Sequence, residues 1–166
     1  MKIFLTGQPH AGKSTLLHKV IENVQAKNGF LSPAVMADGQ RIGFDIVSAR
    51  GTIVPLARIN SSSRTRVSRY GVHVLAIDDL RSELLSIQPS DLLYIDEIGQ
   101  MEFLCPSFEK VLHQYLQSNN SFIGTLSAVY SNPVIDSIRS NPQYTVIEIT
   151  PENRDQVAKD IIKMLG

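Results

Sequence analysis

The feature of this sequence that most constrains its fold is a glycine-rich stretch near the start of the chain. Gly7, Gly12, Lys13 and Ser14 have the spacing of a phosphate-binding loop, Gly-x-x-x-x-Gly-Lys-Ser. The apolar run 2–6 before this loop is typical of a buried strand, and residues 14–25 after it have the apolar spacing of a helix. Such a loop requires this order of strand, loop and helix, so the pattern indicates an α/β fold.

The chemistry of this loop follows from its backbone and two side chains. Successive N–H groups bind phosphate oxygens, and the positive N-terminal end of the following helix strengthens the attraction. Lys13 is predicted to contact the β- and γ-phosphates of a nucleotide, and the Ser14 hydroxyl is predicted to be a ligand of Mg²⁺. The residues expected to contact the nucleotide here are Gly7, Gln8, Pro9, His10, Ala11, Gly12, Lys13, Ser14 and Thr15.

His10 stands where such loops often have glycine. The middle of the loop can require a positive φ, and histidine adopts positive φ more readily than most residues. We therefore predict a left-handed backbone at His10. A catalytic or metal-binding role is disfavoured, because the other three histidines form no ligand-spaced cluster with it.

The rest of the chain alternates between strand and helix patterns, except in one segment. Residues 29–75 contain β-like runs without a convincing helix, and we expect an antiparallel hairpin insert there. Buried strands are predicted at 92–95, 121–127 and 144–149, and helices at 78–87, 106–117, 132–139 and, after the capping signature Thr150-Pro151-Glu152, to about 164. This alternation predicts a single α/β domain over residues 1–166, with a mainly parallel central sheet covered by helices on both faces.

A second chemical motif is the acidic pair Asp96-Glu97, which follows the apolar run Leu92–Ile95. The end of this buried strand is expected to face the same crevice as the phosphate-binding loop. Asp96 is predicted to bind Mg²⁺, and Glu97 to act as the base for the water that attacks the γ-phosphate. An Asp-Glu-Ile-Gly sequence also occurs in GTP switches, but the chain contains no Asn-Lys-x-Asp guanine-binding motif.

The predicted insert is basic. Between Asp45 and Asp78 there are five arginines and no acidic residue. This pattern indicates either a solvated basic face or a loop that places a guanidinium on the transition state, with Arg66 and Arg69 as the candidate catalytic residues. At the end of the strand 121–127, Thr125 is a candidate sensor of the γ-phosphate, with Ser127 as its substitute.

Composition excludes several other functions. The net charge is zero, so no overall field attracts the chain to nucleic acid, and no aromatic platform accompanies the arginines. The single cysteine excludes an internal disulfide, and no apolar run reaches the roughly 18 residues of a membrane-spanning helix. We expect a cytoplasmic protein without membrane contact, a monomer or weak oligomer, with nucleic acid an improbable partner.

Together these motifs resemble a family of P-loop nucleoside-triphosphatases found in bacteria, archaea and animals. The resemblance extends over nearly the whole chain and rests on the segments GQPHAGKSTL, GF at 29–30, RIGFDI from Arg41, RVSRYGV from Arg66, IDEIGQMEF from Ile95 and TPENRD from Thr150. It implies a RecA-like three-layer P-loop NTPase fold, with a catalytic glutamate beside the magnesium aspartate. It also implies slow hydrolysis of ATP, GTP and possibly CTP and UTP, and it makes Asn153 and Arg154 candidates for a base or ribose contact.

The chain departs from the family pattern at three positions. His10 replaces a usual glycine, and Ala34 and Met36 stand where a Glu and an Arg commonly follow the GF motif. The simultaneous loss of both charges indicates a missing ion pair rather than two lost catalytic groups. These departures bear on nucleotide preference and on contacts with any second ligand.

We therefore predict an Mg²⁺-dependent enzyme that hydrolyses nucleoside triphosphates to diphosphates and phosphate. Two alternatives remain open. One is a nucleoside or nucleotide kinase in which the arginine-rich insert is a lid, because Glu97 could equally accept the proton of an acceptor hydroxyl. The other is a nucleotide-dependent module associated with nucleic acid, for which salt-sensitive binding by the arginine segment would be expected.

Overall fold

Five parallel strands form the centre of the sheet in the computed structural model, which describes residues 1–166. The three inner strands of the five have a neighbour of the same direction on both sides, whereas the two outer ones have such a neighbour on one side only. Across the sheet they are β10 (Thr145–Glu148), β1 (Lys2–Thr6), β9 (Phe122–Leu126), β8 (Leu92–Ile98) and β2 (Lys27–Leu31). The loop after β1 and the acidic pair of β8 are thereby brought to the same edge of the sheet, with only β9 between their strands.

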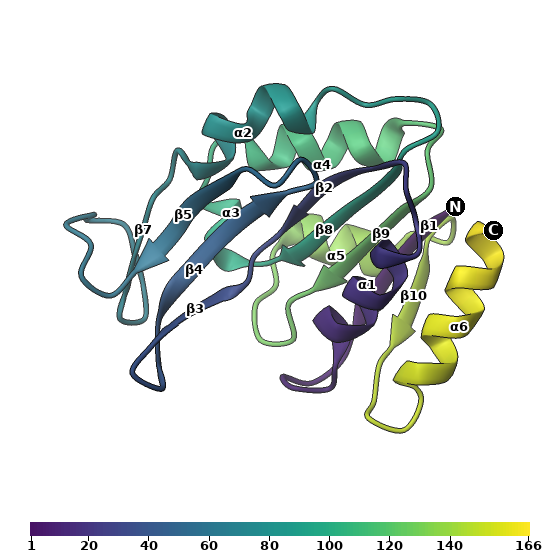
Figure 1. Ribbon diagram of the computed structural model, residues 1–166, viewed down its shortest axis with the longest axis horizontal. Helices are drawn as coiled ribbons and strands as arrows, with labels where there is room; N and C mark the ends of the chain where they lie inside the picture. Colours follow the sequence, from purple (N-terminus) through teal and green to yellow (C-terminus); the bar gives the residue numbers. More distant parts are fainter.

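The insert continues this sheet with antiparallel strands. It contains β3 (Ala34–Ala37), β4 (Gln40–Ser48), β5 (Ile53–Arg58), β6 (Arg66–Val67) and β7 (Tyr70–Val72). It joins the centre through β4, which pairs with β2 (Figure 1). The ten-stranded sheet is therefore mixed, and the prediction of a mainly parallel central sheet extended by an antiparallel hairpin insert is confirmed. The predicted insert began too early, however, because Gly29 lies inside the parallel strand β2.

Helices cover both faces of the sheet and complete three layers (Figure 1). One face carries α1 (Lys13–Glu22) and α6 (Arg154–Leu165), whose apolar side chains belong to a core of 12 buried residues. The other face carries α2 (Ala76–Leu84), α4 (Phe108–Gln117) and α5 (Pro133–Ser140), over a core of 23 buried residues. The predicted α/β architecture is confirmed. No helix is long and apolar enough to cross a bilayer.

The strand β8 shows why the central strands read as uninterrupted apolar runs. Leu93 and Ile95 belong to the larger core, whereas Leu92 and Tyr94 belong to the smaller one. Side chains alternate between the two faces of a strand, so a strand covered on both faces needs apolar residues at every position. The same packing holds β8 in place and so determines where Asp96 and Glu97, near its C-terminal end, lie.

Several element boundaries differ from those predicted. The helix predicted at 78–87 begins and ends earlier, as α2 over Ala76–Leu84, and the last strand of the insert, β7, ends at Val72. The four-residue helix α3 (Gln100–Phe103) was not predicted. The capping signature that starts at Thr150 does not lie directly at the start of the helix, because α6 begins at Arg154. The Thr150 hydroxyl instead accepts a hydrogen bond from the Asn153 N–H at 3.3 Å, in a turn that precedes the helix.

Candidate functional site

The Gly7–Ser14 loop connects β1 to the first turn of α1. His10 has φ 65°, which confirms the predicted left-handed conformation, and its side chain is exposed. Gly12 caps the N-terminus of the ten-residue helix α1 with φ 102°, and the Leu16 N–H donates to the Gly12 carbonyl at 2.9 Å. The N–H groups of the first turn of α1 are thus directed toward the loop, as phosphate binding requires.

The Lys13 side chain lies within this loop rather than in solvent. The residue is only 9% exposed, and its Nζ donates to the carbonyls of Gly7 at 2.8 Å and Gln8 at 3.2 Å. Burial lowers the pKa of the Lys13 ammonium, while the charges of Glu97 and Asp96 raise it in partial compensation. This electrostatic coupling places the lysine in one site with the acidic pair.

Asp96 is held by hydroxyl groups from two other elements. The Ser14 hydroxyl of α1 donates to Asp96 Oδ1 at 3.0 Å, across 82 residues of sequence. The Thr125 hydroxyl of β9 donates to the same oxygen at 2.5 Å. Asp96 is itself only 6% exposed, so these two contacts set the orientation of its carboxylate.

The position of Thr125 differs from what a phosphate sensor needs. Its side chain is fully buried, and its hydroxyl is used by Asp96, so it lies behind that carboxylate. The register explains this, since Gly124 of β9 lies opposite Ile95 of β8, which brings the next residue of each strand, Thr125 and Asp96, side by side. Ser127, two residues later, lines the cavity instead and accepts the Tyr130 N–H at 3.2 Å.

Glu97 shares its surroundings with a second buried acid, Glu102 of α3. A Cβ placed on Gly99 would lie 2.6 Å from Glu97 Oε1 and 3.2 Å from Glu102 Oε2, so the two carboxyl groups face the same point. Burial and the neighbouring charge of Asp96 raise the pKa of Glu97, although Lys13 lowers it. Burial and Glu97 raise the pKa of Glu102 to about 8.

These acids line one side of a cavity of about 480 Å³. Ser14 contributes to it from α1, Asp96 and Glu97 from β8 at the centre of the sheet, and Arg41 from β4 of the insert. Arg41 was part of a quoted motif but was not predicted as a site residue. The signal that could have found it is its place at the start of a long strand beside the site.

The two arginines predicted to be catalytic do not line this cavity. Arg66 Nη2 donates to the Arg69 carbonyl at 2.6 Å, and Arg69 Nη2 donates to the Arg41 carbonyl at 3.0 Å. The Arg69 guanidinium also lies over the Tyr70 ring, 5.3 Å from its centroid. Both guanidinium groups therefore brace the hairpins of the insert, and their catalytic role stays a prediction.

The C-terminal pair predicted to contact the nucleotide divides into two cases. Arg154 lies directly against the phosphate-binding loop, because a Cβ on Gly12 would be 2.8 Å from Arg154 Nη1. The Asn153 amide, in contrast, is used within the turn: its Oδ1 accepts the Thr150 N–H and its Nδ2 donates to the Glu148 carbonyl, both at 2.9 Å. The structure thus brings Arg154 to the loop and assigns Asn153 to the turn.

Comparison with known proteins agrees with this geometry. The model of a protein family described as NTPase matches residues 2–162. The chain belongs to this NTPase family. Two similar members are nucleoside-triphosphatase THEP1 of Thermotoga sp. (strain RQ2), 33% identical and covering 99% of this chain and 95% of its own, and the cancer-related nucleoside-triphosphatase of Homo sapiens, 34% identical and covering 96% and 94%.

Solved structures of the NTPase family have the same fold. The crystal structure of THEP1 from Aquifex aeolicus superposes with a TM-score of 0.88 at 31% identity, over 99% of both chains. The solution structure of a human cancer-related nucleoside triphosphatase gives a TM-score of 0.83 at 31% identity, over 99% of this chain and 96% of the other. The predicted P-loop NTPase fold is confirmed.

Proposed function

We propose that this protein hydrolyses nucleoside triphosphates to diphosphates and phosphate in an Mg²⁺-dependent reaction. The observation that carries this proposal is the contact of Ser14 with Asp96, which joins the phosphate-binding loop to the acidic pair. The printed names of the relatives, which are nucleoside-triphosphatases, support the same reaction. The substrates expected are ATP and GTP, followed by CTP and UTP. A cytoplasmic location and a monomeric or weakly associated state stay predictions from the sequence.

The donor set of the site suits Mg²⁺. Ser14 Oγ and Asp96 Oδ1 are oxygen atoms 3.0 Å apart, and Mg²⁺ prefers oxygen ligands. No group of three or more His, Cys, Asp or Glu residues could hold a metal alone. The small number of protein ligands agrees with Mg²⁺, which usually keeps several bound waters and uses substrate phosphates as further ligands. Bound Mg²⁺ would supply charge compensation on the β- and γ-phosphates.

The residues of the chain supply the remaining chemistry. Main-chain N–H groups of the loop and Lys13 bind the phosphates, and Arg154 lies where it could contact the rest of the nucleotide. Glu97 orients a water and accepts its proton as the water oxygen bonds to the γ-phosphorus. The bond from the γ-phosphorus to the bridging oxygen breaks, and its electron pair leaves with the diphosphate.

A first test uses Lys13→Ala. Phosphate release from ATP and GTP should require Mg²⁺ and stop with EDTA, and Lys13→Ala should lower kcat/KM by about 100-fold or more, because a buried cation on the transferred phosphate is lost. Lys19→Ala, an exposed lysine on the same helix, is the control. Equal rates for Lys13→Ala and wild type would show that phosphate release does not occur at this loop.

A second test separates the arginines. Arg41 lines the cavity, so Arg41→Ala should lower kcat by at least about tenfold through lost charge stabilisation. Arg66→Ala and Arg69→Ala should leave kcat within about twofold of wild type if their guanidinium groups only brace the insert. A larger loss of kcat in either of these variants would instead support the catalytic role predicted from the sequence. Thermal unfolding of each variant is measured to distinguish a loss of catalysis from a loss of folded protein.

A further inference from the structure

The cavity beside Glu97 is much larger than the attacking water alone requires. Its volume is about 480 Å³, whereas one water occupies about 30 Å³ in the liquid. Residues 7–12 of the phosphate-binding loop do not line it, and neither does any residue of α6. Apart from Ser14 and His18 of α1, the lining therefore comes from β8, the insert and the segments that follow β2, β8 and β9 rather than from the loop or the Arg154 side.

The far wall of the cavity has the composition of a pocket for a ring-bearing molecule. It is formed by apolar and aromatic side chains from the insert and from the segment after β9: Pro33, Ala34, Phe44, Val67, Val129 and Tyr130. A phosphate group needs hydrogen-bond donors and cations, and these side chains offer no cation and only one donor, the Tyr130 hydroxyl. Binding pockets for small molecules typically combine such apolar walls with a few polar groups.

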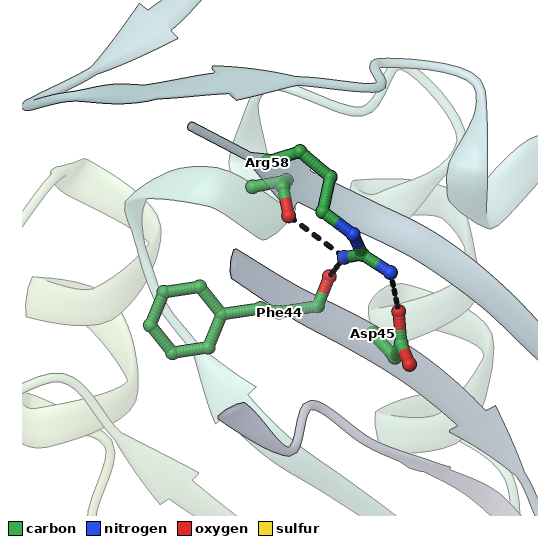
Figure 2. A network of polar contacts seen from close by, with 4 residues as sticks. Phe44, Asp45 and Arg58 are labelled. Atoms are coloured by element: carbon green, nitrogen blue, oxygen red, sulfur yellow. Dashed lines mark hydrogen bonds and ion pairs between the residues drawn. The ribbon is translucent and has the colours of Figure 1, made fainter. Parts of the chain in front are cut away.

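The aromatic ring of Phe44 is held in place by the hairpin that carries it. The Arg58 guanidinium donates to the Phe44 carbonyl at 2.9 Å and pairs with Asp45 Oδ1 at 2.5 Å (Figure 2). The Tyr70 ring meets the Phe44 ring edge-on at a centroid distance of 5.4 Å. The Arg41 guanidinium lies over the Phe44 ring, 5.3 Å from its centroid. Because the backbone, one edge and one face of Phe44 are in contact with other groups, the ring is preorganised as part of the wall rather than free to collapse into the cavity.

The polar groups of the same cavity indicate a neutral ligand. The lining contains Asp96, Glu97 and Glu102 but one arginine, Arg41, so an anionic ligand is disfavoured. Since burial and Glu97 raise the pKa of Glu102 to about 8, its carboxyl group is protonated at neutral pH and can donate a hydrogen bond. Gln100 adds an amide that can both donate and accept.

We propose that this cavity binds a nucleoside as a phosphate acceptor, with its base against Phe44 and Tyr130 and its primary hydroxyl at Glu97. The proposal rests on the proposed function, because it uses the same bound triphosphate. The hydroxyl oxygen bonds to the γ-phosphorus, the bond to the bridging oxygen breaks with its electron pair leaving on the diphosphate, and the hydroxyl proton moves to Glu97. The products are a nucleoside diphosphate and a nucleoside monophosphate, and hydrolysis is the reaction that occurs when water takes the acceptor position.

The test is a transfer assay with defined probes. Mg·ATP labelled in the γ-phosphate is incubated with the protein and each of the common ribonucleosides and deoxyribonucleosides, and labelled phosphate and nucleoside monophosphate are separated. At least one nucleoside should become labelled, and Glu97→Gln should abolish both products. Free phosphate without any labelled nucleoside would overturn this proposal while leaving the proposed hydrolysis intact. Retention of both products in Glu97→Gln would overturn the assignment of Glu97 as the proton acceptor in both reactions.

Variants of the apolar wall make the test specific to the cavity. Tyr130→Ala should raise the KM for the nucleoside by about 5- to 150-fold, the range for loss of a stacked aromatic ring, without changing phosphate release in the absence of nucleoside. Tyr130→Phe keeps the ring and should behave as wild type, and Phe44→Ala should repeat the effect from another element, with its thermal unfolding checked. Binding of the nucleoside at this wall would be contradicted if wild type, Tyr130→Ala and a folded Phe44→Ala had equal KM values for the nucleoside. A nucleoside that stimulates phosphate release but is never labelled would contradict its role as the acceptor.

Discussion

Glu97→Gln is expected to lower kcat for ATP hydrolysis by about 10²- to 10⁴-fold, the usual contribution of a general base, while nucleotide binding persists. The amide has nearly the same shape as the carboxylate but cannot accept the proton of the attacking water. Glu97 lines the cavity beside Asp96, and Asp96 keeps its contacts with Ser14 and Thr125 in this variant. The measurements are steady-state phosphate release and the equilibrium binding of a fluorescent ATP analogue.

The control for this prediction is Glu109→Gln, the same chemical change at an exposed position in the first turn of α4. It should leave kcat and nucleotide affinity within about twofold of wild type. A Glu97→Gln enzyme with kcat close to that of wild type would show that another group activates the water. Loss of nucleotide binding together with kcat would show that Glu97 acts through binding or folding instead.

Gly29→Ala is expected to destabilise the fold by about 3 to 5 kcal/mol, combining backbone strain with overpacking. Gly29 has φ +148°, and a Cβ there would lie 1.9 Å from the Tyr94 carbonyl oxygen of β8. The neighbouring backbone cannot move away, because β2 and β8 are paired along their length from Lys27 to Leu31. The loss of unfolding free energy is measured by urea denaturation monitored with circular dichroism. A variant that cannot be obtained as folded protein would show a loss at or above the upper end of this range.

Gly39→Ala is the matched control, because it introduces the same methyl group at another positive φ. Gly39 has φ +75°, but a Cβ there would meet nothing within 4 Å. It should cost only about 1 to 2 kcal/mol, from the left-handed backbone alone. Equal losses of unfolding free energy in the two variants would show that the approach of β2 to β8 is not the cause.

The predictions from the sequence were most accurate for features that depend on local backbone geometry. The left-handed backbone of His10 followed from the loop, and β1 was predicted with its observed bounds. The acidic pair was predicted to meet the loop because parallel strands end at one edge of a sheet, and the contact between Ser14 and Asp96 agrees with this. Each of these inferences depended on backbone geometry that a short sequence pattern determines.

The insert was predicted less well, because its side chains are organised by strand pairing. Five arginines within one stretch looked equivalent in the sequence. Arg66 and Arg69 are engaged by carbonyl groups of the insert, whereas Arg41, outside that stretch, lines the cavity. Similarly, Thr125 and Ser127 were ranked from sequence alone, and the register of β9 on β8 decided which of them is covered.

The sequence by itself determined that this chain has a phosphate-binding loop, a buried strand ending in two acids and an α/β alternation, because spacing and apolar pattern specify those features locally. Only the tertiary structure decided which arginine lines the cavity and which hydroxyl groups hold Asp96. It also decided that a cavity with an apolar wall adjoins Glu97. Such features depend on contacts between elements far apart in sequence. Their positions are set by how the mixed sheet packs, and no single segment encodes them.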